Sequence, residues 1–289
     1  MSNIPLKGII VPLVTPLSSD TQLDKRSLRK LVRHCVDGSV QGIFPGGTSG
    51  FGPLLPQKVW NDLMETVLEE AGDTSILMAG AMAPSTVLSL ERVKILEKMG
   101  YRRFVATTPF YISPKNDEEH RRHFFTLSNS TSMEMVIYNI PICTGVHIPE
   151  TIVNELSIKG ASKDCKDSSG DDARFERLCK KSDETGLRMY MGMKPDIKRL
   201  HKIGASGCVP IPANVFPSLF SSVWLEPNTE NQSLIDNIWD VFVKKNDFLS
   251  ATLYALSLVG IGSEHHISPY SKSDQTTKHS VKRVVEKYF

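Results

Sequence analysis

Short runs of apolar and β-branched residues recur along the chain, and each run ends at Gly, Pro or a polar cluster. This pattern is typical of buried strands in a parallel sheet. The predicted strands begin at Gly8, Gly42, Ser75, Arg103, Glu134, Gly160, Leu187 and Gly207.

The segments between these runs carry apolar residues at helical spacing. After Asp24, one stripe is formed by Leu28, Leu31, Val32, Cys35 and Val36, and Gly38 ends the segment. After Pro84, which is expected in the first turn, a second stripe is formed by Val87, Leu90, Val93 and Leu96. Further helices are expected to open at Pro56, Asn116, Pro149, Asp171 and Pro195.

Strand and helix alternate about eight times, which predicts an α/β protein with a parallel sheet closed into a TIM (β/α)8 barrel. A doubly wound open sheet is the alternative, although no GxGxxG follows the first strand. After about Asn228 the strand-like runs stop, and the sequence through Gly262 predicts continuous helix. We therefore expect a barrel domain over residues 1–227 and a C-terminal helical extension over 228–289, with an amphipathic helix in the tail HSVKRVVEKYF.

Composition and charge exclude several classes of function. The 289 residues are 40% apolar and 23% charged, which is ordinary for a globular protein. The formal net charge is +2 and no Lys/Arg block is interleaved with aromatics, so no nucleic-acid partner is expected. No apolar run approaches the roughly 18 residues of a membrane span, and the start MSNIPLKGII lacks the features of a signal peptide. A cytoplasmic protein is the expectation.

The cysteines and histidines do not predict a metal site. Five cysteines without CxxC spacing are expected to be reduced and, except for Cys143, buried. The doublet His265–His266 has no third ligand at suitable spacing and is expected in a surface loop.

The predicted strand ends are polar, and in a barrel the working groups lie at the C-terminal ends of the strands. These ends are residues 46–50 (GGTSG), 107–111 (TTPFY), 138–141 (YNIP) and 166–171 (KDSSGD). Two lysines, Lys163 and Lys166, lie three apart on one strand, so only one of them can face the barrel interior. Burial there favours a neutral amine, the form that attacks a ketone. From the residues alone, a solvent-facing lysine, a simple tight turn at GGTSG and a structural Tyr138 all stay open.

Taken together, these four motifs, in this order, resemble the dihydrodipicolinate synthase and N-acetylneuraminate lyase superfamily, and the resemblance runs from Gly8 to Gly262. It implies a class I aldolase or lyase that holds pyruvate as a Schiff base on Lys166 and needs no metal or organic cofactor. It implies that Tyr138 relays protons and that Lys163 has no role. It further implies a homotetramer built as a dimer of dimers, in which Tyr111 reaches toward a neighbouring subunit's site.

The resemblance also implies a substrate-binding set. The turn would hold the pyruvyl carboxylate through Gly47, Thr48 and Ser49, and backbone groups at Gly192 and Val209 would line the pocket.

Three departures from the family pattern bear on the substrate. Phe51 stands where many members have an acid, and GGTSGFGPLL is similar to the spelling of 2-keto-3-deoxygluconate aldolases. Cys143 stands where the synthase branch binds a carboxylate with arginine, and a thiol cannot replace that bidentate group. Lys194 follows the seventh strand where sialate lyases carry acids, which suits a distal carboxylate or phosphate better than a polyol.

The sequence thus predicts a lyase that cleaves a 2-keto-3-deoxy sugar acid to pyruvate and a small aldehyde. Within the class, dihydrodipicolinate synthase, N-acetylneuraminate lyase and a sugar-acid dehydratase or hydratase-aldolase are alternatives. A barrel that binds without catalysis is the rival of another kind.

Overall fold

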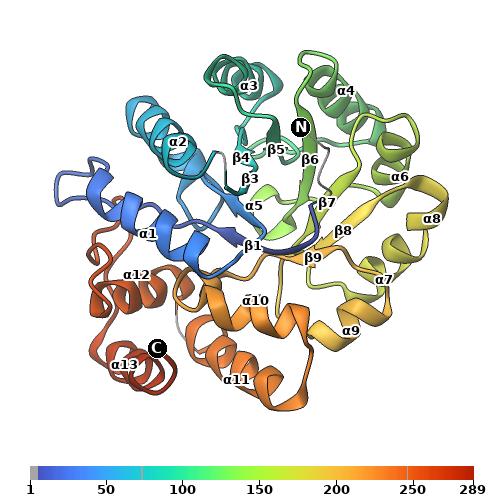
Figure 1. Cartoon of the computed structure of the whole chain (residues 1–289). Coiled ribbons are helices and arrows are strands. Elements are labelled where there is room, and N and C mark those ends of the chain that lie inside the picture. The colour runs from blue at the N-terminus through green and yellow to red at the C-terminus, as the bar shows by residue number, and fades with distance from the viewer. Residues whose placement is uncertain (1–5, 73, 246) are drawn as a thin grey trace. The chain divides into compact units, whose positions relative to one another are not determined.

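Strands and helices alternate along the chain in the computed structural model, which describes residues 6–72, 74–245 and 247–289 (Figure 1). Residues 1–5 lie outside the described residues. They are part of the predicted barrel domain and of the N-terminal segment for which no signal peptide is predicted. The chain divides into two compact units, Met1–Lys7 with Leu77–Val209 and Gly8–Ile76 with Pro210–Phe289. No helix in the described ranges is long and apolar enough to cross a membrane.

The first unit is built on parallel strands that pair in chain order. Its strands are β4 (Ala79–Gly80), β5 (Arg103–Ala106), β6 (Glu134–Asn139), β7 (Asp164–Asp167), β8 (Arg188–Met191) and β9 (Gly207–Cys208). Its helices are α3 (Thr86–Met99), α4 (Asp117–Ser128), α5 (Pro141–Thr144), α6 (Glu150–Ile158), α7 (Asp172–Lys180), α8 (Ser182–Thr185) and α9 (Ile197–Lys202). The register pairs Tyr138 with Lys166 and Asn139 with Asp167, so β6 and β7 end at the same level.

The second unit begins with the parallel pair β1 (Gly8–Pro12) and β2 (Gly42–Phe44), joined through helix α1 (Lys25–Asp37). A 3₁₀ turn, η1 (Gly52–Leu54), and helix α2 (Gln57–Ala71) follow. The short strand β3 (Ile76–Leu77) spans the boundary between the units. The C-terminal part contains η2 (Ile211–Asn214), α10 (Pro217–Leu225), α11 (Thr229–Trp239), the π-turn η3 (Asp240–Lys244), α12 (Phe248–Leu258) and α13 (Gln275–Tyr288).

The predicted helices form, and side-chain caps define most of their starts. Asp24 and Ser85 each accept a hydrogen bond from the first turn of α1 and α3, and the left-handed backbone of Gly100 (φ 96°) ends α3. Pro84 therefore precedes the cap and does not lie in the first turn. The apolar stripe predicted on α3 is partly wrong, because Val87 is 65% exposed. Arg92 faces inward instead, where its Nη1 donates to the Met82 carbonyl at 2.6 Å.

Every predicted strand run contains a strand, but the details differ. The third run is divided into β3 and β4, and the sixth begins at Asp164 and not at Gly160. The prediction of one continuous C-terminal helix was wrong. The π-turn η3 and the start of α12, capped by Asp247, interrupt it. The helical tail is present as α13. The domain boundary at residue 227 stays a prediction.

Four cysteines are buried and Cys143 is exposed, and all five are free thiols, as the sequence predicted. Burial raises the pKa of Cys179 to about 12. It raises the pKa of Cys35 and Cys208 further, so these thiols remain protonated in the core.

Candidate active site

Lys166 lies inside the first unit with its amine over an aromatic ring. Its side chain is buried, at 4% exposure, and Nζ lies 4.1 Å from the centroid of the Tyr138 ring. Tyr138 is 3% exposed and pairs directly with Lys166 in the sheet, so both side chains extend from the same face of neighbouring strands. The structure thus brings together the amine and the phenol that the sequence singled out.

Lys163 lies on the same strand run but elsewhere in the fold. Its Nζ donates to the carbonyls of Ser157 at 2.7 Å and Thr185 at 2.9 Å, near the ends of α6 and α8. Because these carbonyls bind the Lys163 amine, the two amines lie in different environments. This agrees with the prediction that only one of the two lysines faces the barrel interior.

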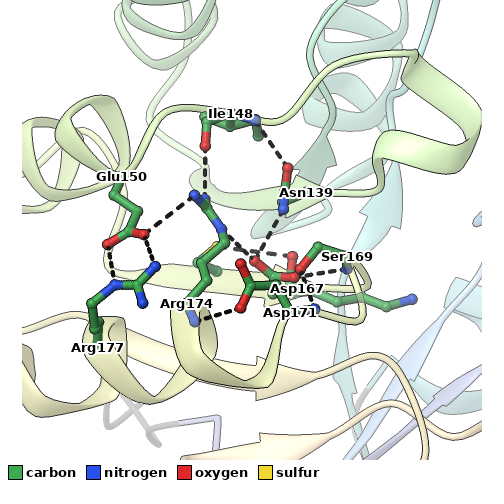
Figure 2. A network of polar contacts seen from close by, with 10 residues as sticks. Asn139, Ile148, Glu150, Asp167, Ser169, Asp171, Arg174 and Arg177 are labelled. Carbon is green, nitrogen blue, oxygen red and sulfur yellow. Dashed lines mark hydrogen bonds and ion pairs between the residues drawn. The ribbon is translucent and has the colours of Figure 1, made fainter.

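Behind Lys166 lies a buried polar network that the sequence did not predict. The Asp167 carboxylate accepts hydrogen bonds from Asn139 Nδ2 at 3.0 Å, Arg174 Nε at 3.1 Å and the Ser169 N–H at 2.8 Å. Figure 2 shows Arg174 extending from α7 to Asp167 and to the carbonyl of Ile148. The only signal in the sequence is that Asn139 and Asp167 each follow a site residue.

Gly192 leaves room for the lysine at the end of β8. A Cβ at this position would lie 1.9 Å from Ser168 Oγ and 3.0 Å from Lys166 Cε. Its N–H donates to the Asp167 carbonyl, and the Val209 N–H donates to Met191, both at 2.8 Å. Gly192 and Val209 therefore continue the sheet pairing at the end where Lys166 lies.

Two predicted substrate-binding residues are exposed. Cys143 lies in the short helix α5. Although the residue is exposed, partial burial of its thiol raises the thiol pKa, and the positive charge of Lys166 acts in the opposite direction. Lys194 precedes Asp196, the N-cap of α9. Both side chains can thus be reached from solvent.

The GGTSG turn belongs to the second unit and is closely packed. The N–H groups of Gly50 and Gly52 donate to the Gly47 carbonyl at 3.1 and 3.0 Å, and Thr15 Oγ1 donates to the Gly50 carbonyl at 2.7 Å. A Cβ at Gly52 would lie 1.7 Å from the carbonyl oxygen of Gly46, so only glycine fits there. Ser49 is buried in this turn and Thr48 is half-buried.

Phe51, the first departure from the family pattern, is buried directly after this turn. Its backbone is left-handed (φ 56°), and its ring lies 6.0 Å from His266 and 5.9 Å from Tyr270, centroid to centroid. His265 and His266 are half-buried, and the loop that contains them packs against Phe51 next to the turn. Among the described residues, no three His, Cys, Asp or Glu side chains form a group that could hold a metal ion.

The TTPFY segment follows β5 and is held by histidines of α4. His123 Nε2 donates to the Thr107 carbonyl at 2.9 Å, and its Nδ1 accepts from Thr86 Oγ1 at 2.9 Å. His120 Nδ1 lies 3.1 Å from Thr108 Oγ1. Burial lowers the pKa of His123 to about 4, so the ring is neutral at pH 7.

This burial predicts a loss of stability in acid. The ordinary His pKa of 6.5 applies to the unfolded chain, whereas folded His123 stays neutral down to about pH 4. The contribution of His123 to the free energy of unfolding is therefore complete above pH 6.5. It falls by about 1.4 kcal/mol per pH unit as the pH is lowered from 6.5 to about 4. In urea unfolding at pH 7, 5.5 and 4.5, His123→Gln should show a shallower pH dependence than the unsubstituted protein. Equal slopes would contradict this assignment.

Comparisons with known proteins show the family of this chain. The model of the dihydrodipicolinate synthetase family matches residues 5–288. The chain belongs to the dihydrodipicolinate synthetase family. A relative in the family, the 4-hydroxy-tetrahydrodipicolinate synthase of Chlorobaculum parvum, is 29% identical over 296 residues, with 96% of each chain covered. N-acetylneuraminate lyase 2 of Escherichia coli is 34% identical over 187 residues, which cover 64% of this chain and 60% of the lyase.

The fold of the family is also that of this chain. The dihydrodipicolinate synthase of Thermotoga maritima matches it with a TM-score of 0.90 at 23% identity, with 98% of each chain covered. The predicted α/β barrel of parallel strands with C-terminal helices is therefore confirmed, and the open-sheet alternative is excluded. Membership of the dihydrodipicolinate synthetase family also confirms the predicted enzyme class, a pyruvate-dependent class I aldolase or lyase.

Proposed function

We propose that this enzyme cleaves a 2-keto-3-deoxy sugar acid to pyruvate and a short aldehyde through a Schiff base on Lys166. The observation that carries the proposal is the buried Lys166 amine 4.1 Å from the Tyr138 ring centroid, in a chain of a pyruvate-dependent family.

The chemistry follows from these two groups. The Lys166 amine adds to the C2 ketone, the C2 oxygen takes up one proton from the amine and one from a general acid, and it leaves as water, which gives an iminium. The iminium accepts the electron pair of the C3–C4 bond as that bond breaks, while the C4 hydroxyl loses its proton and becomes the aldehyde. The resulting enamine takes a proton at C3, and water then releases pyruvate and restores the amine. Tyr138 is the group within reach to carry these protons.

The pyruvyl carboxylate needs a separate anion site, and we assign it to Gly47, Thr48 and Ser49. In the described part of the chain, the N–H groups of Thr48 and Ser49 have no hydrogen-bond acceptor, whereas those of Gly50 and Gly52 donate to the Gly47 carbonyl. Successive N–H groups in such a turn form an anion-binding nest. Gly192 and Val209, at the ends of β8 and β9, stay predicted substrate-binding residues beside Lys166.

Three residues favour a sugar acid over the substrates of the two named relatives. Phe51 is buried where an acidic residue would need a partner, Cys143 offers no guanidinium, and Lys194 is an exposed cation. We propose that Lys194 binds a distal carboxylate or phosphate of the substrate.

This assignment predicts a selective kinetic effect of Lys194→Ala. The KM for a 2-keto-3-deoxy acid with a distal phosphate should rise by roughly 5- to 50-fold, since one charged contact is lost. The KM for the uncharged sugar acid should stay nearly constant. Steady-state kinetics with both substrates measures the difference, and Lys198→Ala, on α9, is the matched control. Equal KM changes for the two substrates would contradict the role.

The substrate class is tested by a panel of 2-keto-3-deoxy acids, N-acetylneuraminate, and pyruvate with aspartate semialdehyde. We expect pyruvate release from the sugar acids with the highest kcat/KM of the panel. A higher kcat/KM in either of the other two reactions, or loss of water without pyruvate release, would contradict the proposal and identify the alternative.

We also propose that the protein is a homotetramer in which Tyr111 contacts a neighbouring subunit. Tyr111 is 96% exposed and has a left-handed backbone (φ 72°), and Ile112 and Ile142 are 76% and 89% exposed. Ser113 Oγ donates to the Thr144 carbonyl at 2.6 Å, so the two segments that carry these exposed side chains are in contact. Light scattering should give a tetramer, and Tyr111→Asp should lower the mass. A monomeric unsubstituted protein would contradict this assembly.

A further inference from the structure

Strand β7 carries two buried carboxylates, one on each side of Lys166 along the chain. Asp164 accepts from the guanidinium of Arg188 at 2.5 and 2.7 Å and from the Tyr190 hydroxyl at 2.7 Å. Asp167 accepts from Arg174, Asn139 and the backbone, as described above. Both carboxylates are almost fully inaccessible to solvent. Asp164 and Asp167 therefore form two similar buried ion pairs with arginine, and the two pairs lie at different positions relative to the Lys166 amine.

The pair at Asp167 closes a ring of contacts. Asn139 joins β6 to Asp167 and also accepts from the Ile148 N–H at 3.0 Å. Arg174 joins α7 to Asp167 and also donates to the Ile148 carbonyl at 2.7 Å. Figure 2 shows these groups converging between the two strands and α7. Because each polar group in this buried ring has a partner, the ring is expected to make this part of the fold rigid.

The position of the ring matters because its strand residues are the direct chain neighbours of the site residues. Asn139 follows Tyr138 and Asp167 follows Lys166, and each pair is in register across the two strands. Side chains alternate along a strand, so the ring lies on the opposite face from the amine and the phenol. A shift of either strand end in the ring would move Lys166 relative to Tyr138.

We infer that Asn139, Asp167 and Arg174 are positioning residues that hold the Lys166 amine against Tyr138 for imine formation and proton transfer. The inference rests on the proposed function, because it takes Lys166 as the amine that forms the imine. None of the three residues touches the substrate. Their effect is transmitted through the backbone between neighbouring residues.

The test compares Asp167→Asn with Asp164→Asn. In Asp167→Asn, an NH₂ group replaces one of the two carboxylate oxygens. This group cannot accept the hydrogen bonds of the neighbouring N–H donors, so the ring must rearrange. We expect the rate constant of borohydride trapping at saturating pyruvate to fall by roughly 10- to 100-fold, since misplacement by about 1 Å can cost on the order of 10²-fold. The pyruvate concentration giving half-maximal trapping should change little.

Asp164→Asn is the matched control. Asp164 is on the same strand, is equally buried and, by alternation, lies on the same face as Lys166. It therefore controls both for lost stability and for the removal of a nearby buried charge. Its trapping rate constant should stay within about twofold of the unsubstituted protein at a temperature where both variants are folded. Equal slowing by the two substitutions, or normal trapping by Asp167→Asn, would overturn the inference.

A double-mutant cycle adds Arg174→Gln. If Asp167 and Arg174 act as one device, the double variant should trap pyruvate no more slowly than the slower single variant, whereas multiplied effects would contradict this. If Asp167→Asn does not fold, Arg174→Lys provides the same comparison, because it keeps the charge but loses the bond to Ile148. Trapping that is absent in the unsubstituted protein would instead reject the proposed function itself.

Discussion

Lys166→Ala is expected to lower kcat for pyruvate release by roughly 10⁴-fold or more, because no iminium can form without the amine. The side chain is buried over Tyr138, and Lys163, the other lysine of this strand run, is not placed to replace it because its amine is bonded to two carbonyls near helix ends. The loss should appear in kcat and in kcat/KM alike, since the missing group is the reactant itself.

Lys163→Ala is the matched control for this substitution. It removes a lysine from the same strand run and should leave kcat within a few-fold of the unsubstituted protein. Circular dichroism of both variants would establish that they are folded. Comparable losses of activity in the two variants would show that Lys166 has no special role.

Tyr138→Phe is expected to lower kcat by roughly 10²- to 10⁴-fold, the range for general acid–base groups, while pyruvate trapping persists in part. The phenyl ring keeps the packing against Lys166, and only the hydroxyl that carries protons is lost. Steady-state kinetics and borohydride trapping on the same sample separate the two steps.

Tyr190→Phe is the control for the loss of a buried phenol. Tyr190 pairs with Lys166 from β8, but its hydroxyl shares its proton between the Leu6 carbonyl at 2.6 Å and Asp164 at 2.7 Å. Its removal should cost stability and leave turnover nearly unchanged. Near-normal turnover by Tyr138→Phe, or an equal loss in Tyr190→Phe, would contradict proton transfer by Tyr138.

The sequence predicts those parts of the fold that depend on local pattern. Periodicity located the strands, and the spacing from Asp24 to Gly38 located α1 with both of its ends. The stripe on α3 was misplaced at Val87 because apolar spacing does not show that Arg92 finds a carbonyl inside the fold. The break at η3 was missed because apolar residues continue through it.

The site shows the same division. Lys166 and Tyr138 could be found because they end predicted strands within specific motifs. The Asn139–Asp167–Arg174 ring could not, because it depends on the register of β6 against β7 and on the direction in which Arg174 leaves α7. These are relations between distant segments that no local pattern contains. Buried polar partners next to a strand-end motif are therefore found only once the strands are paired.

The most direct test of the account is reduction of the imine, in which the protein is treated with pyruvate and borohydride and the adduct is mapped by peptide mass spectrometry. A Schiff base on Lys166 should give one reduced pyruvyl group per chain, located on Lys166 and absent from Lys166→Ala. An adduct on Lys163, an adduct that persists in Lys166→Ala, or no adduct at all would contradict it.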